Sequence, residues 1–359
     1  MNNPLVLFSL LLLFVLSVLY LVVRYLANPS SIAAAVRISE RFLGNMSTRS
    51  PQNATETPPF PIDVVYTWAG EGNEDSMRLG DHGELKYSLR SVFENMPWVR
   101  HVFIVMNEKK KPSWFRDDYE KFVTLVGHDQ IFSDGIPANL PTTNSNSIET
   151  ALSNIPGLSE HFIYFNDDFF VSRPISYKRF FNNKGQAMIQ PNLQPVKLGS
   201  TASFKGPLPE FASGFHSHVP LALRKSGFED FKAEYREWVA FVRSIKKRAG
   251  LGCDVCEPYN LPCPCQQIHG TVSNYLEKKG LAKKGPLYAD KVIGPDISYF
   301  NHYNAPLMEK ASKDDLADTF AVNDTAETPE ERKKYGQIIR SFLGRIFSRP
   351  AKIEANSKG

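Results

Sequence analysis

The stretch FIYFNDDFFVSRP at residues 162–174 places two acids, Asp167 and Asp168, in a run of aromatic and aliphatic residues. Such a run predicts a buried strand, in which a carboxylate pair is costly unless something positive neutralises it. Ligands of open parallel α/β sheets lie beyond the carboxyl ends of the strands, so two acids closing a strand predict a binding site. Adjacent carboxylates suit a hard cation such as Mg²⁺ or Mn²⁺. A turn in which Asn166 and Asp167 cap local backbone groups is the structural alternative.

Similar apolar runs recur through the first half of the chain, at 62–68, 101–106, 122–126 and 161–168. Between the first two, one helical stripe is formed by Leu85, Leu89, Val92, Phe93 and Met96, and another helix is expected from Asn146. Strands alternating with helices predict an α/β fold with a mostly parallel Rossmann-like sheet flanked by helices.

The second half predicts two long helices. Apolar residues at helical spacing indicate one helix over 227–248. Thr328, Pro329 and Glu331 form a capping box with proline at the first helical position, so another helix is expected to follow Thr328.

The first 60 residues read as a membrane anchor and a stalk. Residues 5–23 carry no charge and are long enough to span a bilayer. We expect an anchor over 1–26, a stalk over 27–60, a catalytic domain over 61–353 and a tail over 354–359. A cleaved signal peptide is the alternative interpretation of the apolar segment.

Two signals for membrane orientation disagree. Arg24, Arg37 and Arg41 follow the apolar segment, and the positive-inside rule would keep the domain on the cytoplasmic face. Three glycosylation triplets, which begin at Asn45, Asn53 and Asn323, have meaning only in a secretory lumen. We expect a single-pass type II protein in the Golgi, with the cytoplasmic face of a membrane as the alternative.

Composition excludes several classes of protein. The chain has 359 residues, 42% of them hydrophobic, which is enough for a large core and argues against disorder. The net charge of +4 is small, and the compact basic runs are short, at 109–111 and 246–248. No nucleic-acid partner is therefore expected.

The surroundings of the acid pair resemble, in order, the conserved regions of the Stealth family. The matching segments are IDVVYTW at 62–68, GELKYSLRSVFENMPWVRHVFIV at 83–105, LPTTNSNSIETALSNIPGLSEHFIYFNDDFFVSRPI at 140–175, HVPLALRKS at 218–226 and FAVND at 320–324. FLGRIFSRPAKIE near the end is similar to the family's closing segment. The resemblance covers roughly 62–353 and implies a GT-A-like form of the Rossmann sheet.

The resemblance implies a sugar-1-phosphate transferase. Such an enzyme takes a nucleotide sugar, here expected to be a UDP-sugar, and a glycan or glycoprotein acceptor, with Mg²⁺ or Mn²⁺ as cofactor. Asp168 and Asp324 are the implied metal ligands, with Asp167 as a further acid. His218 is the expected base, with His216 as its rival, and Arg243 is expected to stabilise charge on the phosphate. The positions that match the donor site are Asp63, Arg90, Asn144, Asn146 and Glu149.

Two positions depart from the family pattern. Ala69 stands after Trp68 where the family has Asp or Asn, so a donor contact from that side chain is missing or comes from Glu71. In the last region Ala321 replaces a cysteine, whereas the acid Asp324 is retained.

All four cysteines, Cys253, Cys256, Cys263 and Cys265, stand in one short cluster. Two disulfides are expected in a lumen, with three connectivities open, and a zinc site is the alternative. The cluster is an insertion relative to the family core, so it takes no catalytic role from the resemblance.

Two other functions fit parts of the sequence. A metal-dependent glycosyltransferase of the GT-A kind would share the nucleotide-sugar site and the acid pair. An inactive glycan-binding relative would follow if Ala69 reflects a lost donor site. The nucleotide that is released separates the three classes.

Overall fold

The computed structural model describes residues 55–71, 80–189, 195–196, 212–213, 220–245, 268–285, 297–326 and 328–355. The predicted anchor and most of the predicted stalk lie outside these residues. Among the helices within the described ranges, none combines the length and the apolar character needed to cross a bilayer. The elements below belong to one unit, Gln52–Gly359.

The central sheet has five strands in the order β3-β2-β1-β4-β9. Neighbours among the first four strands are parallel, and β9 is antiparallel to β4. The strands are β1 (Ile62–Thr67), β2 (His101–Met106), β3 (Val123–Gly127), β4 (His161–Asn166) and β9 (Leu221–Arg224). Almost every residue of β1, β2 and β4 is buried, as is usual for parallel strands covered on both faces. The predicted mixed α/β fold with a mostly parallel sheet is confirmed.

The order of the strands creates a switch point between β1 and β4. From β1 the chain builds β2 and β3 on one side and then returns to build β4 on the other. Thr67 at the end of β1 pairs with Asn166 at the end of β4. Ligand sites of such sheets lie where the strand order reverses, so Trp68 and Asp167 follow the strands at the expected position.

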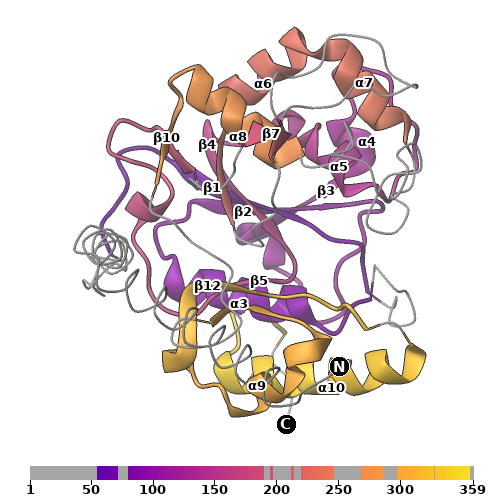
Figure 1. Cartoon of the computed structure of the whole chain (residues 1–359), viewed down its shortest axis with the longest axis vertical. Helices are drawn as coiled ribbons and strands as arrows, with labels where there is room; N and C mark the ends of the chain where they lie inside the picture. Colours follow the sequence, from indigo (N-terminus) through magenta and orange to yellow (C-terminus); the bar gives the residue numbers. More distant parts are fainter. Residues whose placement is uncertain are drawn as a thin grey trace, which may run out of the picture. The chain divides into compact units, whose positions relative to one another are not determined.

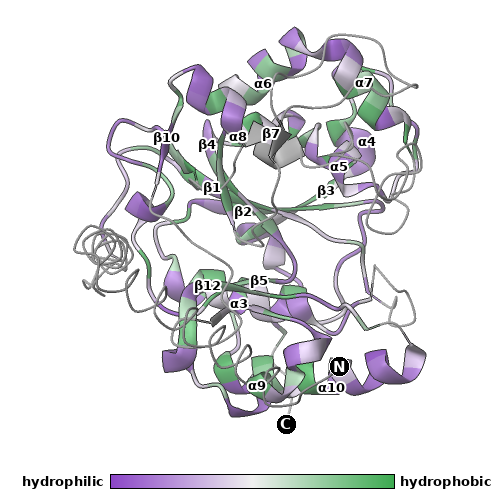
Figure 2. Ribbon diagram, in the orientation of Figure 1, coloured by the Kyte–Doolittle hydropathy of each residue, from purple (hydrophilic) through white to green (hydrophobic). Residues whose placement is uncertain are grey.

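Helices cover both sides of this sheet (Figure 1). On one side lie α6 (Lys225–Glu234), α7 (Arg236–Ser244) and α8 (Ile268–Lys278), and on the other lie α3 (Glu84–Asn95), α9 (Ala305–Lys310) and α10 (Pro329–Ile346). Figure 2 shows hydrophobic strands between helices whose outer faces are hydrophilic. Two short helices, α4 (His128–Ile131) and α5 (Ser145–Glu149), complete the set of described α-helices.

The predicted helices are mostly confirmed, with one correction. The helix expected after Thr328 is α10, whose capping box joins the Thr328 side chain to Glu331 N. The single helix predicted over 227–248 is wrong, because the chain leaves helical geometry at Tyr235 (φ −116°, ψ 37°). Tyr235 N still bonds Phe231 O and Val239 N bonds Tyr235 O, so the apolar periodicity continues across the break and hides it.

A smaller sheet packs against α9 and α10. Its order is β11-β12-β5, from β11 (Ile297–Phe300), β12 (Leu316–Val322) and β5 (Phe169–Val171). A second hydrophobic core cluster surrounds it and includes Phe170, Phe300, Phe320 and Phe342. The remaining strands form two-stranded pairs, β6 (Ala187–Ile189) with β10 (Ala282–Lys284) and β7 (Pro195–Val196) with β8 (Ala212–Ser213).

Candidate active site at the carboxyl edge of the sheet

The acid pair forms the turn between the two sheets. Asp167 and Asp168 follow β4 directly, and the chain then enters β5. Because β5 is antiparallel to β12, Val322 N donates to Asp168 O at 3.0 Å. Asp324 lies two residues beyond β12. The fold therefore brings the two predicted metal ligands to the same edge from distant parts of the sequence.

The two acids carry more negative charge than the described part of the chain neutralises. Burial, and then the charge of Asp81, raises the pKa of Asp167 to about 7. Burial and the charge of Asp167 raise the pKa of Asp168 well above its ordinary value. Within the described residues, Asp168 Oδ1 is buried and has no hydrogen-bond partner. This local excess of negative charge is what a bound cation would relieve.

Sequence reasoning missed a third acid of the site, Glu84. It begins α3, its side chain is buried, and burial followed by the charges of Asp167 and Asp81 raises its pKa. Its Oε2 accepts a hydrogen bond from His82 N at 2.6 Å. An acid in the first turn of a helix is a common stabilising feature, which is why the sequence alone gave it no other meaning.

His82 was also missed, and it contacts Asp324 directly. Its Nε2 lies 2.8 Å from Asp324 Oδ2, and because a carboxylate only accepts hydrogen bonds, Nε2 is the donor. Asp324 Oδ1 accepts from Ala326 N at 3.0 Å. Gly336 of α10 makes room for the imidazole, since an added Cβ there would lie 2.6 Å from His82 Cε1. The sequence gave little sign of this contact, because His82 stands in a loop 242 positions before Asp324 in the chain.

Tyr335 of α10 is influenced by the charges of these carboxylates. Its hydroxyl is buried without a hydrogen-bond partner in the described part of the chain. Burial raises its pKa, and the charges of Asp324, Glu84 and Asp168 add to the effect, together with Tyr299. Three acids from different elements thus act electrostatically on one phenol.

No metal cluster is formed by the side chains as they stand. Across the described ranges, no three His, Cys, Asp or Glu side chains are grouped as metal ligands. The donor chemistry nevertheless fits a hard cation, because Asp168 offers a buried oxygen with no hydrogen-bond partner among the described residues, and the neighbouring acids also supply oxygen ligands.

A second polar group lies at the ends of β1 and β4. The hydroxyl of Tyr164 is 3.0 Å from Thr67 Oγ1, 2.7 Å from Asn166 Oδ1 and 3.3 Å from Glu149 Oε1, and its single proton can be donated to one of these acceptors at a time. Burial and the charge of Glu149 raise the pKa of Tyr164. The predicted donor-site residue Glu149 is therefore within reach of the switch point.

The two predicted asparagines belong to the same helix as Glu149. Asn144 caps α5 by accepting from Asn146 N, and its Nδ2 donates to Ile245 O at 3.0 Å. Both side chains are buried. Asn144 therefore fixes the position of α5, which carries Asn146 and Glu149.

Two predicted donor-site residues are not at this edge. Asp63 lies at the opposite end of β1, where its carboxylate is paired with Arg100 at 2.8 and 2.6 Å and accepts from Ser159 N. Arg90 makes a two-pronged ion pair with Glu354 and also donates to Phe347 O, so it ties α3 to the C-terminal segment. Both side chains have structural partners that the sequence did not reveal.

Arg243, which was predicted to stabilise charge on the phosphate, is paired inside the protein in this structure. Its side chain is fully buried and pairs with Asp134 at 2.6 and 2.9 Å. Its other donors reach Thr150 Oγ1, Thr150 O and Ile136 O. With every N–H bonded inside the protein, Arg243 holds α7 against α5 in this structure.

Several predicted residues lie outside the described ranges. They are His216, His218 and the four cysteines, Cys253, Cys256, Cys263 and Cys265. Their assigned roles stay predictions.

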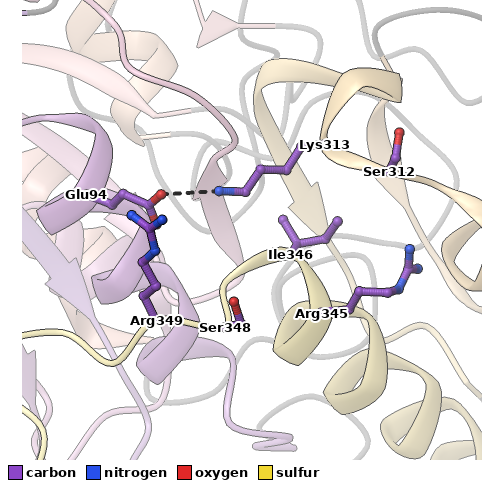
Figure 3. Close-up of a pocket in the computed structure, with 7 residues that line it drawn as sticks. All are labelled: Glu94, Ser312, Lys313, Arg345, Ile346, Ser348 and Arg349. Atoms are coloured by element: carbon purple, nitrogen blue, oxygen red, sulfur yellow. Dashed lines mark hydrogen bonds and ion pairs between the residues drawn. The ribbon is translucent and has the colours of Figure 1, made fainter.

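A pocket of about 360 Å³ lies elsewhere, at the end of α10 (Figure 3). Two of its basic residues have structural partners: Lys313 pairs with Glu94 at 3.3 Å, and Arg345 donates to Met308 O and Ala311 O at 2.7 Å. None of the carboxylates described above lines it. The acidic edge of the sheet, and not this pocket, is the candidate active site.

The fold and the site define a class: an α/β protein with clustered carboxylates at the carboxyl edge of a mostly parallel sheet. Comparison with known proteins narrows this class. The model of the family region described as "Stealth protein CR2, conserved region 2" matches residues 78–189, a segment that includes His82, Glu84, Asp167 and Asp168. Residues 78–189 therefore carry a conserved region of the Stealth family, and the chain is similar to proteins of that family.

Two curated relatives illustrate the similarity. An exopolysaccharide phosphotransferase of Streptomyces coelicolor is 26% identical over 90% of this chain and 64% of its own length. A capsular polysaccharide phosphotransferase of Haemophilus influenzae is 28% identical over 80% of this chain and 84% of its own length. The chain therefore spans less than two thirds of the Streptomyces relative.

Among solved structures, the galactosyltransferase LgtC bound to donor and acceptor sugar analogues is 13% identical. The match covers 77% of this chain and 95% of that one, with a TM-score of 0.37. A score this low supports no conclusion about the function of this chain.

Proposed function

We propose that this protein transfers a sugar-1-phosphate from a nucleotide sugar, a UDP-sugar in the first instance, to a hydroxyl group of a glycan. The relatives named as exopolysaccharide and capsular polysaccharide phosphotransferases support this reaction class. The observation that carries the proposal is the uncompensated carboxylate cluster of Asp167, Asp168 and Glu84 beside the switch point of the sheet.

Asp168 and Asp324, with Asp167 beside them, would hold Mg²⁺ or Mn²⁺. When bound, the cation supplies positive charge for the phosphate oxygens, which is the main requirement of phosphoryl transfer. The protein's own part is to orient these acids: Ala326 N and His82 hold Asp324, while the turn between β4 and β5 fixes Asp168.

The donor lies across the ends of β1 and β4. There, Asn146 and Glu149 of α5 are suited to bonding sugar and ribose hydroxyls. The buried network of Thr67, Tyr164 and Asn166 orients Glu149 toward that position. These residues would hold the donor in place, and the acceptor would approach from the side of the acids.

In the reaction, an acceptor oxygen bonds to the phosphorus next to the sugar. The bond from that phosphorus to the bridging oxygen of the diphosphate breaks, and nucleoside monophosphate leaves with the electron pair. The acceptor hydroxyl loses its proton to a base, for which His218 is proposed from the family resemblance and His216 is the rival.

The released nucleotide tests the proposal. The full chain with Mn²⁺, a panel of UDP-sugars and a mannose-containing glycan should release UMP together with a glycan phosphodiester. UDP as the nucleotide product would instead identify a GT-A-type glycosyltransferase. No nucleotide release, with glycan binding retained, would indicate an inactive relative. The control is Asp168→Asn, which should lose most of the nucleotide release if the reaction takes place at the acidic site.

The membrane location is proposed on sequence alone. The apolar segment 5–23 would anchor a type II protein, with the cytoplasmic face as the alternative. Of the glycosylation triplets, the one at Asn323 immediately precedes the site residue Asp324, so a glycan there would crowd the carboxylates. An endoglycosidase shift that disappears on substituting Asn45 and Asn53 would support a luminal domain, and the absence of any shift would contradict it.

A further inference from the structure

Tyr303 exposes an aromatic ring beside the candidate active site. Its side chain is 74% exposed, and the other exposed large hydrophobic residue in the described part of the chain, Leu140, reaches 38%. Exposing a tyrosine ring to this extent gives up the burial that most aromatic side chains in this protein obtain. Because the ring lies beside the candidate active site, its exposure indicates a role in binding.

A ring contact and a capped turn position the Tyr303 side chain. Its centroid lies 3.6 Å from that of His302, so the imidazole supports the phenol. Asn301 caps the short turn His302–Asn304 by accepting from Tyr303 N at 3.0 Å and Asn304 N at 3.2 Å. A platform whose backbone and supporting ring are both fixed loses little entropy when a ligand stacks on it.

The platform and the carboxylates share one edge of the small sheet. β11 and β12 are parallel, so their carboxyl ends lie together, and Asn323 N donates to Phe300 O at 2.9 Å. His302 Nδ1 is 2.6 Å from Thr325 Oγ1, and Thr325 directly follows Asp324. His302 also lies edge-on to Tyr335, at 6.5 Å between centroids. The aromatic pair is thus linked to the acidic site through two contacts.

We propose that Tyr303, supported by His302, is the stacking platform for a sugar ring of the acceptor glycan. The apolar C–H face of a pyranose packs on an aromatic ring, while its hydroxyl groups remain free for the neighbouring polar groups. A sugar stacked on Tyr303 would present a hydroxyl toward the side of the site that carries Asp324. The inference rests on the proposed function for its choice of ligand.

Binding and kinetics of Tyr303 variants test this inference. Saturation-transfer NMR on the full chain would use methyl α-mannoside, methyl β-galactoside and methyl N-acetyl-β-glucosaminide as probes, with UMP in a separate arm. Tyr303→Ala should weaken binding of at least one glycoside about tenfold, the order expected for one aromatic stacking contact. Tyr303→Trp should retain binding. Leu140→Ala is the matched control for loss of an exposed apolar side chain and should change nothing.

Kinetic measurements distinguish an effect on acceptor binding from an effect on donor binding. Tyr303→Ala should raise the acceptor KM about tenfold while leaving the donor KM and the melting temperature unchanged. A raised donor KM or a loss of UMP binding would overturn the inference in favour of nucleobase stacking. Unaltered glycoside binding would reduce Tyr303 to a surface residue. If the parent releases UDP while Tyr303→Ala still loses glycoside binding, the proposed function fails and this inference stands.

Discussion

Two groups of buried charges in this protein behave in opposite ways. At the contact between α7 and α5, Asp134 is paired with Arg243 and Lys232. At the edge of the sheet, Asp167 and Asp168 face Asp81, Glu84 and each other. Both groups contain acids with low exposure to solvent, but Asp134 has two cationic partners, whereas Asp168 Oδ1 has no hydrogen-bond partner within the described residues.

The pKa values record this difference. Burial alone would raise the pKa of Asp134, but hydrogen bonds from Arg243 and Asn154 and the charges of Arg243 and Lys232 hold it well below its ordinary value. Burial and neighbouring acids raise the pKa of Asp167 and Asp168 instead. Removing one partner of a buried charge pair is strongly destabilising, whereas a buried charge without a partner costs stability and is expected at sites that bind something.

The largest expected effect comes from breaking the paired group. Arg243→Met should lower the free energy of unfolding by about 3–5 kcal/mol, because it leaves Asp134 buried with Lys232 alone. Urea denaturation measures it. The matched control is Arg116→Met, whose partner Asp118 is exposed, and it should cost about 0–1 kcal/mol. An Arg243→Met protein that stays stable but loses turnover would restore the phosphate role that the sequence predicted.

Neutralising Asp168 at the edge of the sheet should do the reverse. Asp168→Asn should lower turnover about 10²–10³-fold, the usual effect of removing one electrostatic contact to a reacting phosphate. Its melting temperature should stay equal or rise, since burial and the charge of Asp167 disfavour a carboxylate at this position. The paired acid Asp318 of β12 gives the control, Asp318→Asn, which should keep turnover. A large loss of stability in Asp168→Asn would show that the carboxylate is structural.

The contact between His82 and α10 offers a smaller effect. Alanine normally stabilises a helix relative to glycine, but Gly336→Ala should cost about 1–3 kcal/mol because the added Cβ displaces the His82 ring. It should also weaken Mn²⁺ binding, which calorimetry measures, by releasing Asp324. Gly344→Ala in the same helix is the matched control, since its Cβ would lie 3.4 Å from Tyr87 Oη. Equal effects at both glycines would contradict the positioning of Asp324 by His82.

The smallest effect is the acid dependence of the paired group. The pKa of Asp134 is depressed on folding, so its stabilisation is fully present above the unfolded value, near 3.8, and is lost as the pH falls toward the folded value. The stability deficit of Asp134→Asn relative to the parent should therefore be constant from pH 7 to about pH 5 and narrow below about pH 4. A deficit that widens in acid would exclude the ion pair as its cause.

The sequence by itself determined the elements of the fold. The apolar runs of β1 to β4 and the capping box of α10 depend on residues close together in the chain, and they fold where the patterns predict. The acid pair at the end of β4 also followed from local pattern, because a strand end in a parallel sheet has a known position. The break at Tyr235 was not predicted, because helical hydrogen bonds continue on both sides of it and the apolar spacing is preserved.

Only the tertiary structure decided which charges have partners. Arg243 and Asp134 meet across 109 positions of sequence, and His82 and Asp324 across 242. No local pattern encodes such contacts, because they depend on how the strands are ordered and how the helices pack on them. An arginine suited to phosphate thus became a structural tie, while Glu84, which looked like an ordinary helix start, joined the acidic site. The residue type determines which charge a side chain can carry, but the tertiary structure determines which opposite charge lies next to it.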